Sequence, residues 1–160
     1  MRYFKPDFLF EHFSGITIKW LKENNITHIF SDLDSTLAAH DQHGTKEFEA
    51  WLSQLRENNV QLVILSNNNQ SRVDIFTEPY RIVGYGKANK PATSKIQRIM
   101  DEVGAKSETS LFLGDQLFTD VWCGKRLKMI TALVHPIEPE HEPWNVSLKR
   151  KAESVIRRGW

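Results

Sequence analysis

The chain has 160 residues, 40% of them hydrophobic and 11% aromatic, which is enough to bury the core of one domain spanning residues 1–160. The formal net charge of +1 gives no global field to attract nucleic acid, and one cysteine excludes an internal disulfide framework. No apolar run approaches the length of about 18 residues that spans a bilayer, and the first residues lack a signal-peptide pattern. We therefore expect a cytoplasmic protein with no nucleic-acid partner.

Helical and strand patterns alternate along the chain. Apolar residues at helical spacing predict helices near residues 14–24, 45–58, 71–76, 93–103 and 118–127. Short apolar runs predict five strands at 26–30, 60–65, 82–83, 111–113 and 129–134. Strands joined by helices indicate right-handed crossovers and a parallel sheet with helices on both faces. We expect an α/β fold with three α/β/α layers and a five-stranded Rossmann-like sheet, extended by helical or irregular segments at 1–25 and 137–160.

Two aspartates, Asp32 and Asp34, directly follow the first predicted strand and are separated by one leucine. Burying a carboxylate is costly unless a cation or hydrogen-bond donors compensate. At the end of a strand, the pair suits a divalent metal and a phosphoryl group. The same residues could instead be ordinary surface acids that cap the following helix.

Polar residues also follow the other predicted strands. Ser66 and Asn67 come after the second strand, Lys90 lies in a loop before a helix, and Asp115 ends the fourth strand with Asp120 one turn later. Ligands of a parallel sheet bind beyond the carboxyl ends of its strands. We therefore expect these residues to gather with the aspartate pair at one edge of the sheet.

This set of residues has the parts that phosphoryl transfer needs, which are a nucleophile, cationic groups and a proton donor. Asp32 can attack phosphorus, and Asp34 can protonate the leaving oxygen and later activate water. Hydrogen bonds from Ser66 and its neighbours, with the charge of Lys90, can hold the phosphoryl oxygens. Mg²⁺ is the expected cofactor, because it prefers few carboxylates plus water. The predicted site has catalytic Asp32 and Asp34; phosphate-binding Ser66, Asn67 and Lys90; metal-binding Asp32, Asp34 and Asp115; and supporting Thr36 and Asp120.

Four motifs, in order, resemble those of the haloacid dehalogenase-like phosphatase superfamily, subclass IIIA. They are Asp32-Leu33-Asp34-Ser35-Thr36, Ser66 at a strand end, Lys90 before a helix, and Gly114-Asp115 followed by Asp120. Any one motif is weak, whereas the ordered set is specific. The resemblance implies a phosphatase or phosphotransferase, since Asp34 fills the position that marks those members.

A closer similarity is to the YqeG-type subfamily, which is itself similar to mitochondrial and plastid phosphatidylglycerophosphate phosphatases. It is carried by Phe4-Lys5-Pro6-Asp7, Ser66-Asn67-Asn68, Gly114-Asp115-Gln116, Phe118-Thr119-Asp120 and Val134-His135-Pro136. The similarity implies that the phosphorylated substrate is a phospholipid head group, such as that of phosphatidylglycerophosphate.

The chain leaves no room for a separate cap domain. About ten residues separate Asp34 from the helix near Thr45, and only one helix and a short strand lie between Ser66 and Lys90. We expect an open site, which suits a large substrate or a lipid head group at a membrane. The missing cap is equally consistent with a minimal domain that has no adaptation to a large substrate.

Several alternatives remain at this point. The enzyme could hydrolyse a soluble sugar or nucleotide phosphate, or the fold could be a non-catalytic binding module. The aromatic residues before residue 14 and the basic residues after 148 could pack or be solvated, or could contact a membrane peripherally. His40 and His43 could bind zinc or touch the entering substrate, and neither role is favoured.

Overall fold

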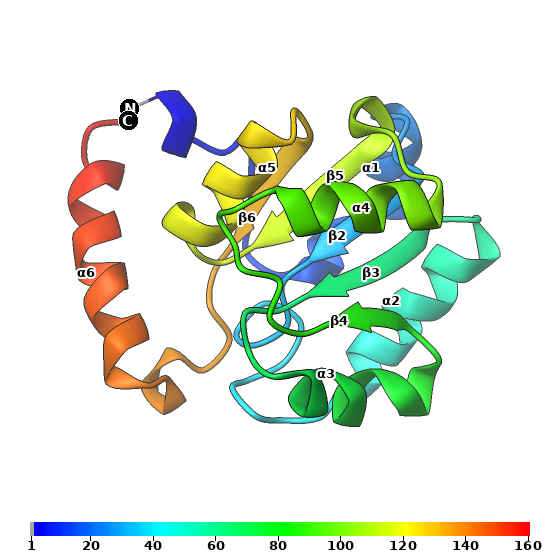
Figure 1. Cartoon of the computed structure of the whole chain (residues 1–160), viewed down its shortest axis with the longest axis horizontal. Helices are drawn as coiled ribbons and strands as arrows, with labels where there is room; N and C mark the ends of the chain where they lie inside the picture. The colour runs from blue at the N-terminus through cyan, green and yellow to red at the C-terminus, as the bar shows by residue number, and fades with distance from the viewer. Residues whose placement is uncertain (1) are drawn as a thin grey trace.

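The computed structural model describes residues 2–160 and contains one six-stranded parallel sheet (Figure 1). The strands are β1 (Phe8–Phe10), β2 (His28–Ser31), β3 (Gln61–Leu65), β4 (Val83–Tyr85), β5 (Ser110–Gly114) and β6 (Ile130–Val134). Their order across the sheet is β1-β6-β5-β2-β3-β4. The predicted parallel α/β sheet is confirmed, but the predicted number of five strands is wrong because the N-terminal segment supplies β1.

The helices follow the expected pattern of alternation. They are α1 (Ile18–Glu23), α2 (Lys46–Glu57), α3 (Gln70–Thr77), α4 (Ser94–Val103), α5 (Trp122–Arg126) and α6 (Trp144–Arg157). Thr17, Thr45 and Asn69 begin the first three, and each side chain accepts a hydrogen bond from a backbone N–H of the first turn. Within residues 2–160, no helix combines the length and the apolar character that crossing a membrane requires.

Helices cover both faces of the sheet. Successive residues of a strand point to opposite sides, so an apolar strand presents an apolar surface on each face. In β3, Leu62 and Ile64 face the core formed with α1, α2 and α3, whereas Val63 and Leu65 face α4 and α5. The same alternation occurs in β5. The three-layer arrangement therefore follows from central strands that are apolar on both faces.

The edge strand β1 is fixed to β6 by Asp7. Its carboxylate accepts hydrogen bonds from the backbone N–H of Thr131 at 2.9 Å and from the Thr131 hydroxyl at 3.0 Å. Phe8 and Phe10 pack edge-on against Trp20, with ring centroids 4.9 and 5.2 Å apart. These aromatic residues of the N-terminal segment are thus used in packing.

The direction in which successive strands are added to the sheet reverses between β2 and β5. From β2 the chain proceeds to β3 and β4 on one side, whereas β5 and β6 lie on the other. Neighbouring loops diverge at such a switch point, which leaves a crevice at the carboxyl ends of the strands. Figure 1 shows α6 standing beyond these carboxyl ends.

Candidate active site

Asp32 lies at the switch point, immediately after β2. Its backbone N–H donates to the carbonyl of Leu113 at 2.9 Å, which continues the pairing of β2 with β5. The ammonium of Lys90 donates to Oδ1 of Asp32 at 2.9 Å and to Oδ1 of Asp120 at 2.7 Å. All three side chains are buried. The structure therefore brings together three residues from distant parts of the sequence around one ammonium group.

Asp120 is held by the turn that carries it. It lies in η5 (Leu117–Val121), a π-helical turn, and its Oδ2 accepts the backbone N–H groups of Asp115 at 3.2 Å and Gln116 at 3.1 Å. Gly114 allows this close approach, since a Cβ atom there would lie 2.3 Å from the Asp120 side chain. The Gly-Asp motif thus requires glycine at this position, because any side chain there would clash with Asp120.

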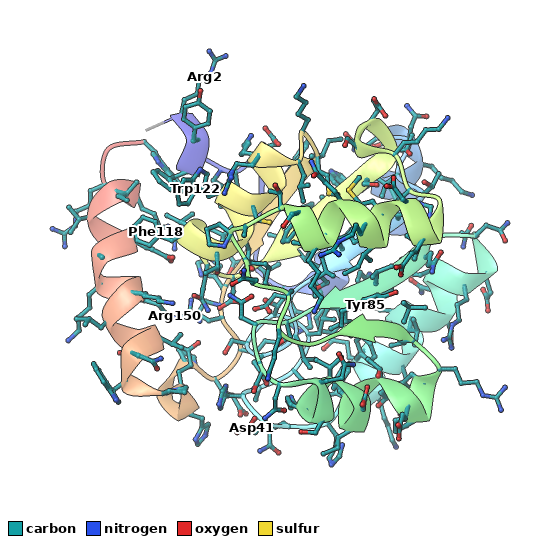
Figure 2. The ribbon with its side chains drawn as sticks, in the orientation of Figure 1. Arg2, Asp41, Tyr85, Phe118, Trp122 and Arg150 are labelled. Atoms are coloured by element: carbon teal, nitrogen blue, oxygen red, sulfur yellow. The ribbon has the colours of Figure 1, made fainter. Side chains whose placement is uncertain are left out.

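Asp115 is enclosed by partners on both carboxylate oxygens. The hydroxyl of Thr36 donates to Oδ1 at 2.7 Å, and the guanidinium of Arg150 bonds Oδ2. Arg150 also donates to the backbone carbonyl of Asp115 at 3.1 Å and pairs with Glu142 through two nitrogens. Figure 2 shows Arg150 extending from α6 toward the body of the molecule. In the sequence Arg150 is one of several basic residues near the C-terminus, and no local pattern singles it out.

Asp34 has a separate set of partners. Its Oδ1 accepts hydrogen bonds from Nε and Nη2 of Arg72, at 3.1 and 2.9 Å, and from the backbone N–H of Asp41 at 2.9 Å. The amide of Asn68 donates to Oδ2 at 3.3 Å. Arg72 is buried and also bonds the carbonyl of Gln42 at 2.7 Å. Arg72 was not among the predicted site residues, because nothing in the local sequence pattern distinguishes it from an exposed helix residue.

The carboxylates form two groups rather than one. Oxygens of Asp32, Asp115 and Asp120 lie within 4.8 Å of one another, whereas Asp34 groups with His40 and Asp41. The sequence-based metal set comprised Asp32, Asp34 and Asp115. In the structure the side chain that groups with Asp32 and Asp115 is that of Asp120, and the assignment of Asp34 to the metal stays a prediction.

Ser66 and Asn67 follow β3 and differ in what they can offer a ligand. The Ser66 oxygen accepts the N–H of Asn68 at 3.0 Å, and its hydroxyl proton can still be donated to a ligand. The amide of Asn67 donates to the Lys90 carbonyl at 2.9 Å and accepts the Lys90 N–H at 2.8 Å. Asn67 therefore positions the loop of Lys90, and its predicted contact with phosphate stays a prediction.

A single cavity joins the two carboxylate groups. The loops that follow the strands contribute residues from one side, and α6 and the segment that leads into it contribute residues from the other. Its lining comprises Asp32, Asp34, Ser35, His40, Ser66, Asn67, Asn68, Lys90, Gln116, Thr119, Glu142, Pro143, Asn145, Val146 and Lys149. As expected, no cap is inserted between Asp34 and Thr45. The site is less open than expected, however, because the C-terminal segment forms one wall of the cavity.

Burial is the largest single influence on the pKa values of Asp32, Lys90 and Asp115. Burial raises the pKa of Asp32 well above its usual value, and the nearby Asp120 and Asp115 raise it further against the opposing effect of Lys90. Burial alone would lower the pKa of Lys90, but the two carboxylates that it bonds outweigh burial and raise that pKa. The pKa of Asp115 is also raised by burial, although Arg150 opposes the shift.

The residues present fit a divalent cation. When ionised, the four carboxylates of Asp32, Asp115, Asp120 and Glu142 face the two cations Lys90 and Arg150, which leaves two negative charges. Three of these carboxylates offer oxygens within 4.8 Å of one another. Hard oxygen donors of this kind suit Mg²⁺. A divalent cation at this position would balance the remaining charge.

Comparison with known proteins agrees with this geometry. Residues 9–134 match the family model of the haloacid dehalogenase-like hydrolases. The chain is 34% identical over 161 aligned residues to a protein of Bacillus subtilis (strain 168) named probable phosphatase YqeG, covering 98% of this chain and 94% of the relative.

Solved structures share the fold at low sequence identity. The cobalt-bound deoxy-D-mannose-octulosonate 8-phosphate phosphatase of Haemophilus influenzae is 14% identical with a TM-score of 0.56, covering 71% of this chain and 70% of the other. The corresponding Moraxella catarrhalis enzyme, in complex with magnesium, phosphate and its sugar, is 13% identical with a TM-score of 0.51, covering 63% and 65%. The chain thus belongs to the haloacid dehalogenase-like hydrolases, and the prediction of a phosphatase-type hydrolase is confirmed.

Proposed function

We propose that the protein is a Mg²⁺-dependent phosphomonoester phosphatase that forms an aspartyl-phosphate on Asp32. The observation that carries this proposal is the placement of Asp32 in the wall of the cavity with Lys90 bonded only to Oδ1. Among residues 2–160, no hydrogen-bond donor engages Oδ2 of Asp32, so this oxygen is available as the nucleophile.

The proposed reaction has two steps. In the first, Oδ2 of Asp32 attacks phosphorus, the bond between phosphorus and the leaving oxygen breaks, and Asp34 gives that oxygen a proton. In the second, Asp34 takes a proton from water, the water oxygen attacks phosphorus, and the Asp32 carboxylate is released with inorganic phosphate. The hydroxyl of Ser66 and the ammonium of Lys90 stabilise the phosphoryl oxygens in both steps.

The division of roles between the acids follows from their partners. Asp32 and Asp115, with Asp120 beside them, would hold Mg²⁺, which when bound supplies charge neutralisation for an anionic substrate. Asp34 reaches the same cavity from the other carboxylate group, where Arg72 and the N–H of Asp41 fix its orientation. We therefore assign Asp34 to proton transfer.

Hydrolysis of phenyl phosphate tests the proposal. The purified protein should release phosphate with added Mg²⁺, lose activity in EDTA and regain it when excess Mg²⁺ is restored. Asp32→Asn should have no measurable turnover. Because this variant is purified in the same way as the unaltered protein, it also controls for a contaminating phosphatase. Activity retained by Asp32→Asn at the level of the unaltered protein would refute the proposed nucleophile.

We further propose that the substrate is a phospholipid head group, with phosphatidylglycerophosphate as the candidate implied by the subfamily resemblance. The surface of α6 that points away from the cavity supports peripheral contact with the cytoplasmic face of a membrane. Trp144, Leu148 and Val155 on this surface are 79%, 59% and 66% exposed, and the exposed cation Arg158 follows them. An apolar stripe with cationic residues suits an anionic bilayer surface.

Two assays distinguish a lipid from a soluble substrate. Cosedimentation should show binding to vesicles with anionic phospholipid and little binding to neutral vesicles, and Trp144→Ser with Leu148→Ser should weaken it. In mixed micelles, phosphatidylglycerophosphate should be hydrolysed with a higher kcat/KM than any of a panel of soluble sugar and nucleotide phosphates. Preference for a soluble ester would instead favour the alternative substrate class.

A further inference from the structure

The helix α6 is fixed to the part of the chain that carries the catalytic acids. Glu153 is buried on α6 and accepts the backbone N–H of Phe118 at 3.2 Å. Ile156 packs against the cluster of Leu117, Val121 and Leu133. Together with the bonds from Arg150 to Asp115, these contacts hold α6 against η5 and the residues just before it. The cavity wall that α6 provides is therefore built into the fold.

The wall contains a cation without a partner. Lys149 lines the catalytic cavity together with Asn145 and Val146 and is solvent-exposed. No carboxylate within residues 2–160 lies close enough to form an ion pair with its ammonium, whereas the nearby Glu142 is neutralised by Arg150. A free ammonium at the wall of a cavity attracts an anionic group of a ligand.

Lys149 and Lys90 line the same cavity from different elements and have different electrostatic surroundings. Lys90 is buried between Asp32 and Asp120, so its charge serves the reacting phosphoryl group. Lys149 comes from α6, on the wall that faces the catalytic loops. A substrate bound with its phosphoryl group at Asp32 would have its alcohol portion in the rest of the cavity, where Lys149 is available.

We propose that Lys149 determines substrate specificity by binding a second anionic group, carried by the alcohol portion of the phosphomonoester. This inference rests on the proposed function and names the substrate class of the same site. The second group is either a carboxylate or a phosphodiester, since both present anionic oxygens to an ammonium. Esters with an uncharged alcohol portion lack this contact.

Steady-state kinetics with matched substrates tests the proposal. Glycerol phosphate has an uncharged alcohol portion, phosphoglycolate carries a carboxylate, and glycerophosphoglycerol phosphate carries a phosphodiester. Lys149→Met should lower kcat/KM for at least one anionic substrate by about tenfold, through KM, which corresponds to one charge-assisted hydrogen bond. The loss for glycerol phosphate should be several times smaller, and Lys149→Arg should restore much of the difference.

The matched control is Lys151→Met, since Lys151 is also exposed on α6 but does not line the cavity. It should reproduce the kinetics of the unaltered protein. The selective loss in Lys149→Met should also shrink as ionic strength rises, because the contact is exposed to solvent. The anionic substrate that shows the loss identifies whether the second group is a carboxylate or a phosphodiester.

Equal losses on charged and uncharged substrates, or no loss on any, would overturn the role of Lys149 while leaving the phosphatase proposal intact. If the unaltered protein hydrolyses none of the phosphomonoesters, phenyl phosphate included, the proposed function fails and the inference fails with it.

Discussion

Lys90 donates a hydrogen bond from its ammonium to Oδ1 of Asp32 at 2.9 Å, and both side chains are buried. The same ammonium bonds Asp120 at 2.7 Å. A buried carboxylate that must attack a phosphate ester needs such a cation, because two anions otherwise repel each other strongly in a site of low dielectric constant. Lys90 therefore couples Asp32, the proposed nucleophile, to the acidic motif after β5.

Replacing Lys90 by methionine should lower kcat by about 10²- to 10³-fold, the cost typical of removing one group that stabilises developing charge. The variant should also be less stable, since Asp32 and Asp120 lose a shared buried partner. Stopped assays on phenyl phosphate and thermal unfolding measure the two effects. Lys106→Met, at an exposed lysine before β5, is the control and should change neither. A Lys90→Met enzyme with normal kcat would contradict this role.

Arg72 should act through the orientation of Asp34. Because Asp34 is assigned to protonate the leaving oxygen, Arg72→Met should reduce kcat most for esters with a poorly acidic alcohol and least for p-nitrophenyl phosphate. Asp34→Asn should show the same dependence on the leaving group with a larger loss of kcat, about 10²- to 10⁴-fold for alkyl esters. Arg72→Lys should recover only part of the activity, since lysine cannot make the two bonds that Nε and Nη2 make. Equal losses for all leaving groups would indicate a merely structural role.

Arg150 should stabilise the folded protein mainly in the absence of metal. In Arg150→Met, the carboxylates of Asp115 and Glu142 lose the guanidinium that they share. We expect a loss of about 1–3 kcal/mol in the free energy of unfolding in EDTA. Excess Mg²⁺ should recover part of this loss, because a divalent cation also neutralises Asp115. Denaturant unfolding with and without Mg²⁺ measures both effects.

Lys151→Met is the control for Arg150→Met. It removes a cation from the same helix, but Lys151 forms no ion pair with any residue of 2–160. A change in Arg150→Met no larger than that of the control would show that the contact with Asp115 contributes nothing to stability.

Cys123 should be unreactive in the folded protein. Burial against α4 and β5 raises the pKa of its thiol to about 12. Since the thiolate is the reactive form, its population at pH 8 should be about four orders of magnitude below that of the thiol. Iodoacetamide at pH 8 should leave the native protein unmodified and alkylate it fully in guanidinium chloride. Mass spectrometry that finds rapid alkylation of the native protein would contradict this environment.

The sequence predicted the central strands and the acids at their ends, because both depend on local patterns. Apolar runs define β2, β3 and β5, and a parallel sheet places the residues that follow them at one edge. Asp32, Ser66 and Asp115 could be assigned to one edge for this reason, since each directly follows one of these strands. The number of strands could not be predicted in the same way, because β1 has three residues and depends on pairing with β6 from the far end of the chain.

The contributions of Arg72 and Arg150 required the structure. Arg72 lies in the first turn of α3, and only the path of the loop after Asp34 brings a carboxylate to it. Arg150 is flanked by Lys149 and Lys151, and its burial depends on which face of α6 is turned toward η5. Long-range packing of this kind leaves no local signal that separates a buried arginine from a solvated one.

The most direct test of the central claim is to trap the phosphorylated enzyme. Rapid acid quenching of the reaction with phenyl phosphate, followed by peptide mass spectrometry, should find one phosphoryl group on the peptide that contains Asp32, and more of it in Asp34→Asn, which should hydrolyse it slowly. This phosphoryl group should be absent from Asp32→Asn. Turnover with no phosphorylated Asp32 at any quench time, or a phosphoryl group on another residue, would contradict the central claim.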